Sequence, residues 1–119
     1  MEFKDHQAIY LQIAESVCER ILNGVWKEED RIPSVRELGA TLGVNPNTVA
    51  RTYEYLQQRE IIYNKRGIGF FVSSGARREI LADLKNSFLT KELPVFFSRL
   101  DTLGITIEEI EGYYKKYIQ

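Results

Sequence analysis

The 119-residue sequence has only one cysteine, one histidine and three prolines. A single cysteine, Cys18, excludes an intrachain disulfide and a thiolate-rich metal site, and it fits a reducing cytoplasm. We expect Cys18 to be a small buried apolar residue rather than a redox sensor. The His, Cys and carboxylate residues show no metal-ligand spacing, and no nucleophile–base pair or phosphate-binding loop is visible. These absences predict a protein that is not an enzyme and that uses no metal or cofactor.

Long apolar runs and an excess of charge are also missing. No apolar stretch approaches the roughly 20 residues that span a bilayer, and the polar segment Met1–Gln7 is unlike a signal peptide. We therefore expect a cytoplasmic protein with no membrane partner. The 16 basic and 17 acidic residues nearly cancel, so the net charge neither indicates nor excludes a nucleic-acid partner. Residues 31–72, however, hold six basic and three acidic side chains, a local net charge of +3.

Residues 8–23 have the pattern of an amphipathic helix. Apolar side chains recur at every fourth position, at Ile9, Ile13, Val17 and Ile21. Gly24 suits the position just past the end of this helix, where a left-handed conformation is common. Residues 25–32 then read as a loop or a short edge strand.

Two short helices with capping signals follow. Ser34 and Glu37 have the spacing of a capping box, and Gly43 ends the first helix. Asn45 is a favourable N-cap for the second helix, and Pro46 loses no hydrogen bond at the first helical position. We expect this second helix to bury Val49, Tyr53 and Leu56. The two short helices and the turn between them form a helix-turn-helix arrangement, which generic helical hairpins also have.

A basic hairpin is predicted directly after these helices. Residues 61–63 and 70–72 are short apolar runs with strand propensity. The segment between them, residues 64–69, contains Asn and Gly residues that permit a tight turn, and it carries Lys65 and Arg66. Such a hairpin is a wing. The predicted fold is therefore mainly α with a small β-hairpin, an N-terminal winged helix-turn-helix with a helical tail.

The start of the second short helix is the predicted reader of DNA, because the major groove admits one helix and helix-turn-helix proteins contact bases near its N-terminus. The candidate residues on the two capped helices are Arg36, Asn45, Asn47, Thr48 and Arg51. A structural alternative stays open, in which Asn45 only caps the helix and Thr48 only faces solvent. Lys65 and Arg66 could touch DNA or merely keep the hairpin edge soluble.

Four stretches of the sequence form a combined pattern: IYLQI at 9–13, PSVREL at 33–38, GVNPNTVARTY at 43–53 and RGIGFFV at 66–72. This pattern resembles the GntR family of bacterial regulators. It implies a winged-helix fold, binding to double-stranded operator DNA and transcriptional repression. It also implies DNA contacts by Arg36, Asn47, Thr48, Arg51 and the wing residues from Gly67 to Gly69.

The chain departs from the family pattern at four places. Ala8 replaces a usual Pro, and Glu28-Glu29 replaces a usual Pro-Gly turn. Gly39 replaces a usual Ala, which should weaken that helix by roughly 1 kcal/mol. Ile68 stands where a basic residue is common, so we expect weaker phosphate contacts from the wing.

The residues after Ser73-Ser74-Gly75 form a helical tail, so the predicted division is a DNA-binding domain at 1–75 and a dimerisation segment at 76–119. Pro94 should break or kink the tail, and Gly104 should end a helix. Thr106 and Glu109 have capping-box spacing for a last helix. The tail resembles the YtrA subfamily, in which two helices dimerise the protein and which often controls neighbouring ABC-transporter genes.

An apolar and aromatic stripe in the tail needs burial, either against the N-terminal domain or in a twofold homodimer interface, which would match a palindromic operator. The candidate interface residues are Phe88, Phe96, Phe97, Leu100, Tyr113, Tyr114 and Tyr117. No residue identifies a small-molecule effector.

Two other functions compete with this interpretation. One is a winged-helix module that binds only protein, against which Arg36, Asn47, Thr48 and Arg51 on one prospective face argue. The other is the regulator half of an aminotransferase-fused relative, against which the capped last helix argues.

Overall fold

The computed structural model describes all 119 residues as two compact units, residues 1–81 and 82–119. The sequence places a boundary after Gly75, whereas the structure adds the first turns of the following helix to the first unit. The reason is that Ala76 and Ile80 on that helix are buried in the core of the first unit. No helix is both long and apolar enough to cross a membrane.

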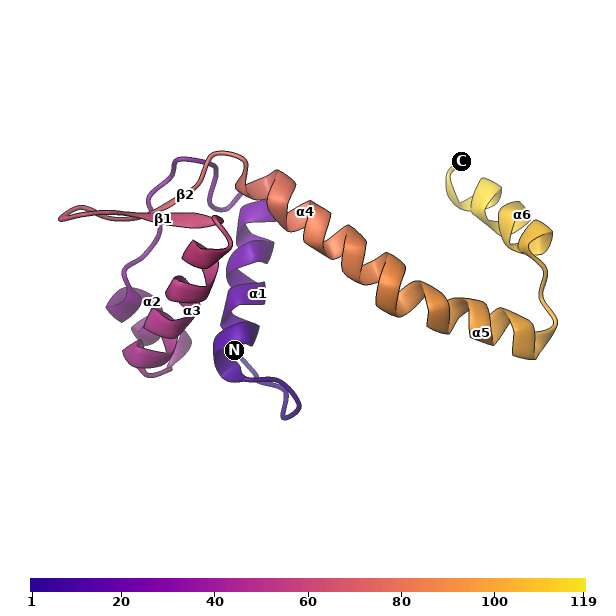
Figure 1. The fold of residues 1–119 in the computed structure, drawn as a ribbon, viewed down its shortest axis with the longest axis horizontal. Helices are drawn as coiled ribbons and strands as arrows, with labels where there is room; N and C mark the ends of the chain where they lie inside the picture. Colours follow the sequence, from indigo (N-terminus) through magenta and orange to yellow (C-terminus); the bar gives the residue numbers. More distant parts are fainter. The chain divides into compact units, whose positions relative to one another are not determined.

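The first unit is a three-helix arrangement with a two-stranded hairpin (Figure 1). Its elements are α1 (Ile9–Leu22), α2 (Val35–Leu42), α3 (Pro46–Gln58), β1 (Ile62–Lys65) and β2 (Gly69–Val72). Helix α3 is central, because it packs against α1, α2 and β1. The expected winged helix-turn-helix fold is confirmed.

The core is formed where these elements meet. The predicted buried face of α3 is confirmed, since Val49, Tyr53 and Leu56 are almost fully buried. The Tyr53 hydroxyl donates to the Pro33 carbonyl oxygen at 2.6 Å, and burial raises the pKa of Tyr53 well above its usual value. The ring of Tyr53 also contacts Phe70 edge-on, with centroids 4.9 Å apart. One side chain thus joins α3 to the segment before α2 and to the hairpin.

The predicted helix ends are confirmed. In α2 the Glu37 N–H donates to Ser34 Oγ and the Ser34 N–H donates to Glu37 Oε1, both at 3.1 Å. The bond from the Ser34 backbone holds the pKa of the Glu37 carboxyl below its usual range. Gly43 ends α2 with φ +70°, and Asn45 caps α3 by accepting the Asn47 N–H at 2.8 Å.

The turn between α2 and α3 explains Gly39, which the sequence alone marks only as a weak helix former. A Cβ atom at this buried position would lie 2.9 Å from the Val44 carbonyl oxygen and 3.5 Å from Pro46 Cα. The Val44 N–H donates to the Gly39 carbonyl at 2.9 Å, which holds the two backbones together. The missing side chain therefore permits the close approach of the two helices, a benefit that helix propensity does not register.

The hairpin strands are longer than predicted. The register pairs Tyr63 with Phe71 and Lys65 with Gly69, so both ends of the expected turn belong to strands. The turn itself is residues 66–68. Arg31 forms an isolated bridge with Phe71, so the segment expected as loop or edge strand runs beside β2 for one residue pair.

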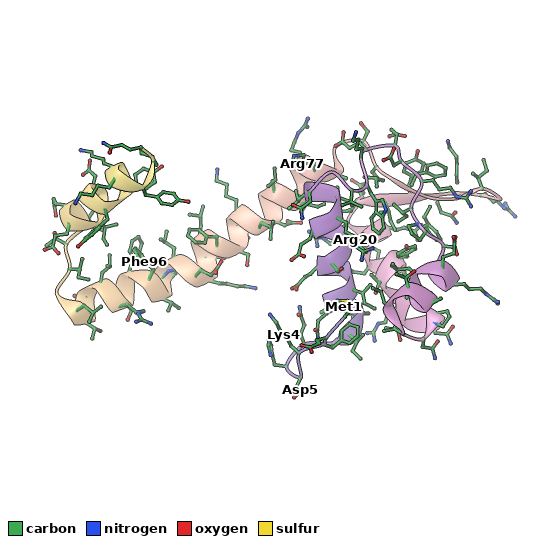
Figure 2. The ribbon with its side chains drawn as sticks, turned by 180° about the vertical axis from the view of Figure 1, so that it is seen from behind. Met1, Lys4, Asp5, Arg20, Arg77 and Phe96 are labelled. Carbon is green, nitrogen blue, oxygen red and sulfur yellow. The ribbon has the colours of Figure 1, made fainter.

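Polar contacts tie the ends of α1 to neighbouring chain. The buried Gln12 amide clasps the N-terminal segment, because Oε1 accepts the Lys4 N–H at 2.7 Å and Nε2 donates to the Lys4 and Gln7 carbonyls at 2.8 Å each. At the other end, Arg77 Nη1 donates to the Leu22 carbonyl oxygen. Figure 2 shows Arg77 beside the C-terminal end of α1 and Lys4 in the loop before its start.

The second unit contains most of one long helical stretch and a final helix. Helix α4 (Ala76–Ser87) begins in the first unit and continues into the π-helical turn η1 (Phe88–Glu92) and α5 (Leu93–Leu103); α6 (Ile107–Tyr117) follows.

Pro94 does not interrupt the helix; the irregularity is the π turn just before it, where the Leu93 N–H donates to the Phe88 carbonyl. Of the two predicted effects of Pro94, a break or a kink, the break does not occur. The π turn already replaces the regular α-helical hydrogen bonds next to the proline, whose nitrogen cannot donate one. Gly104 ends α5 with φ +69°, and Thr106 Oγ1 accepts the Glu109 N–H at 3.2 Å.

Candidate nucleic-acid interface

Two shallow clefts meet at the start of α3. The first has a volume of about 700 Å³ and is lined by Val35, Arg36, Asn45, Pro46, Asn47 and Ala50. The second has a volume of about 340 Å³ and is lined by Ala8, Ile9, Tyr10, Asn47, Thr48 and Arg51. Asn47 belongs to both. The structure therefore brings the five helical residues predicted from the sequence onto one continuous surface.

Helix starts position these side chains. Asn45 and Asn47 are exposed, and the Asn45 amide oxygen accepts the Asn47 N–H as a helix cap. The cap uses the carbonyl end of the Asn45 amide, so its NH₂ group stays available for other bonds. Arg36 is exposed in the first turn of α2, where a cation opposes the helix dipole. An anion bound nearby would offset this cost.

Arg51 has a partner that the sequence did not predict. Its guanidinium carbon lies 3.9 Å from the ring centroid of Tyr10, at the start of α1. Tyr10 and Arg51 are 41 positions apart, so no local pattern could pair them.

The two predicted cations of the wing have different surroundings. Lys65 lies over the Phe71 ring, with Nζ 4.7 Å from the centroid, whereas Arg66 is exposed in the turn next to Gly67. Gly69 has φ +145°, and a Cβ there would lie 2.9 Å from Nε of Arg31. Arg31 is thus a further cation against the wing, and the sequence analysis includes it only in the positive charge of residues 31–72.

The fold and the chemistry of this surface agree with what sequence comparison finds. Residues 9–72 match the family model described as bacterial regulatory proteins, gntR family. The chain belongs to the GntR family. It is therefore a DNA-binding transcriptional regulator, and its family consists of regulators rather than enzymes.

Relatives of this GntR-family chain match it over most of its length. The HTH-type transcriptional regulator YhcF of Bacillus subtilis is 37% identical over 93% of this chain and 91% of its own. The HTH-type transcriptional repressor YtrA of the same organism is 32% identical over 91% of this chain and 82% of its own. A GntR-family regulator from Bacteroides thetaiotaomicron, known from a crystal structure, is 57% identical with a TM-score of 0.82, covering 94% of this chain and 97% of that one.

The second unit exposes much of its apolar surface. Of the seven residues predicted for a dimer interface, six are exposed: Phe88, Phe96, Phe97, Tyr113, Tyr114 and Tyr117. The seventh, Leu100, is only 7% exposed and is therefore covered within the single chain. Phe96 and Phe97 contact each other, with ring centroids 6.1 Å apart.

Cys18 is half-buried and packs against the core of the first unit. Burial raises the pKa of its thiol to about 11, with Arg59 opposing this shift in part. The thiol therefore stays protonated near neutral pH. Because the thiolate is the reactive form, Cys18 is unreactive under these conditions. This environment supports a packing role.

Proposed function

We propose that this chain represses transcription as a cytoplasmic homodimer that binds a palindromic operator. The observation that carries the DNA contact is the shared surface of Arg36, Asn47, Thr48 and Arg51 at the starts of α2 and α3. Amide, hydroxyl and guanidinium groups are those that bond base edges and phosphates. The name of its relative YtrA, a transcriptional repressor, supports repression. A transporter operon as the target is proposed from the subfamily resemblance alone.

The wing gives the second group of proposed contacts. Asn45 at the α3 cap, and Lys65, Arg66, Gly67 and Gly69 on the hairpin, complete the proposed set. Because Lys65 already lies over Phe71, Arg66 is the freer of the two wing cations. In this proposal the wing binds the phosphate backbone of the DNA, while the residues at the start of α3 distinguish the bases.

Homodimerisation is supported by the exposed aromatic surface of the second unit. Tyr113 is 70% exposed and Tyr117 is 84% exposed. Large contiguous apolar patches are rare on monomeric proteins, so this exposure supports burial against a second copy of the chain. In a twofold dimer, two copies of α3 would meet half-sites about 34 Å apart, or a multiple of this distance. The proposed segment for dimerisation is residues 76–119.

The test of the DNA contacts is the affinity of Arg36→Ala and Arg51→Ala for operator DNA. We expect each to weaken binding by roughly 1–3 kcal/mol, measured by mobility shift on fragments that the wild-type chain selects. Arg78→Ala is the matched control, because Arg78 is exposed on α4 and lines neither cleft. Either mutant binding like wild type would contradict the assignment. Affinity independent of salt would instead favour a protein-binding module, because phosphate contacts release counterions.

A further inference from the structure

The aromatic ring of Tyr10 lies against Arg51, an exposed cation of the proposed DNA-binding surface. The guanidinium carbon of Arg51 is 3.9 Å from the Tyr10 centroid, well within cation–π range. Arg51 is exposed and makes no ion pair, so this ring is its closest described partner. A guanidinium stacked by its face keeps its N–H donors in the plane, free at the edge. The contact therefore orients Arg51 without using its hydrogen-bonding capacity.

Tyr10 is itself held firmly by α3. Its carbonyl oxygen accepts the hydroxyl of the buried Thr52 at 2.8 Å. Its ring meets Tyr55 edge-on, with centroids 6.1 Å apart and an interplanar angle of 78°. Three side chains of α3, Arg51, Thr52 and Tyr55, thus contact the first turn of α1. These contacts place the Tyr10 backbone and ring against α3.

We infer that Tyr10 is a positioning residue for Arg51 in DNA recognition. The inference rests on the proposed function, in which Arg51 contacts DNA. Tyr10 and Arg51 line the same cleft as Asn47 and Thr48, so a guanidinium held on the ring stands beside the other proposed readers. A long flexible side chain loses conformational entropy when it binds. Stacking on Tyr10 removes part of that freedom in advance.

The test is a double-mutant cycle on the full chain. Variants Tyr10→Leu, Arg51→Ala and the double mutant are titrated, by fluorescence anisotropy, against the labelled duplex that wild type enriches most strongly from random DNA. We expect Tyr10→Leu to weaken binding by about two- to fivefold in the wild-type background and to have no further effect in the Arg51→Ala background. Tyr10→Phe keeps the ring face and should bind within about twofold of wild type.

Two controls separate positioning from a purely structural role. Thermal melts show whether Tyr10→Leu is folded, and Tyr10→Met provides a second aliphatic replacement if it is not. Tyr55→Leu removes the ring that supports Tyr10 but does not touch Arg51, so it should weaken binding less than Tyr10→Leu.

The possible failures are distinguishable. If Tyr10→Leu weakens binding equally with and without Arg51, the residue acts on the fold and the inference is overturned. If Tyr10→Phe binds as poorly as Tyr10→Leu, the hydroxyl matters and the ring face does not, which also overturns it. If Arg51→Ala binds like wild type, the proposed DNA contact has failed, and the Tyr10 inference falls with it.

Discussion

Glu60 adopts a left-handed backbone conformation, with φ +61°, directly after α3. The Ile61 N–H donates to the Leu56 carbonyl at 2.9 Å, a bond that closes the end of the helix around Glu60. Residues with a Cβ are strained in this region, whereas glycine is not. The chain therefore carries a small, removable strain next to α3.

We predict that Glu60→Gly stabilises the folded state by about 1 kcal/mol. Glu54→Gly is the matched control, since it makes the same change at an exposed site inside α3 and should cost about 1 kcal/mol. Urea unfolding at one fixed protein concentration measures both, because dimerisation would make stability depend on concentration. A Glu60→Gly variant as unstable as Glu54→Gly would contradict the strain argument.

The sequence predicted individual residues well where their role is local. Ser34, Glu37 and Asn45 were assigned correctly as caps, because a cap bonds to backbone within three residues. The sequence does not predict the roles of Gly39 and Tyr10, because both depend on contacts between helices. Gly39 permits a close contact between α2 and the start of α3, and Tyr10 contacts Arg51, 41 positions along the chain.

At the scale of elements, the π turn η1 changes which face the tail presents. The exposed residues Leu84 and Phe88 precede the extra residue of the π turn, and the exposed residues Phe96 and Leu103 follow it. In an uninterrupted α-helix, at about 100° per residue, the later two would point roughly 100° away from the earlier two. A π turn takes up one extra residue and so turns the following side chains back by about 100°. Both sets therefore share one apolar face.

This alignment predicts opposite effects of deletion and insertion on the proposed dimer. Deleting Lys91 in a Pro94→Ala background replaces the π turn by regular helix and keeps the alignment, so the dimer dissociation constant should stay within about threefold of the wild-type value. Inserting one alanine after Lys91 in the same background should raise that constant about tenfold or more above the wild-type value. Sedimentation equilibrium measures both. If the deletion raised the dimer dissociation constant as much as the insertion, the idea of one shared apolar face would be contradicted.

The sequence predicted the elements of the first unit almost completely and those of the second less well. Helices in the first unit begin and end at residues with strong local signals, such as Pro46 and Gly43. In the tail, Pro94 predicted a break or a kink. The chain instead forms a continuous helix with a π turn, which no single residue type predicts. The hairpin strands were underestimated because Lys65 and Gly69 have weak strand propensity but are paired across the strands.

At the scale of the whole molecule, the chain combines a compact DNA-binding unit with a second unit rich in exposed aromatic residues. The predicted boundary after Gly75 and the end of the first compact unit at Leu81 differ, because Ala76 and Ile80 at the start of α4 pack into the core of the first unit. Long-range packing of this kind has no local sequence signal. The family model covers residues 9–72, which lie within the first unit, whereas the relatives YhcF and YtrA match most of the tail as well.

We propose that this GntR-family chain reads a twofold-symmetric operator through Arg36 and the start of α3. The decisive experiment is selection of bound fragments from random-sequence DNA, followed by sequencing. We expect an enriched inverted repeat, with half-sites about 34 Å apart or a multiple of that distance, whose enrichment is lost in Arg36→Ala and Arg51→Ala. Absence of any enriched sequence, or an enriched single site without a repeat, would contradict it.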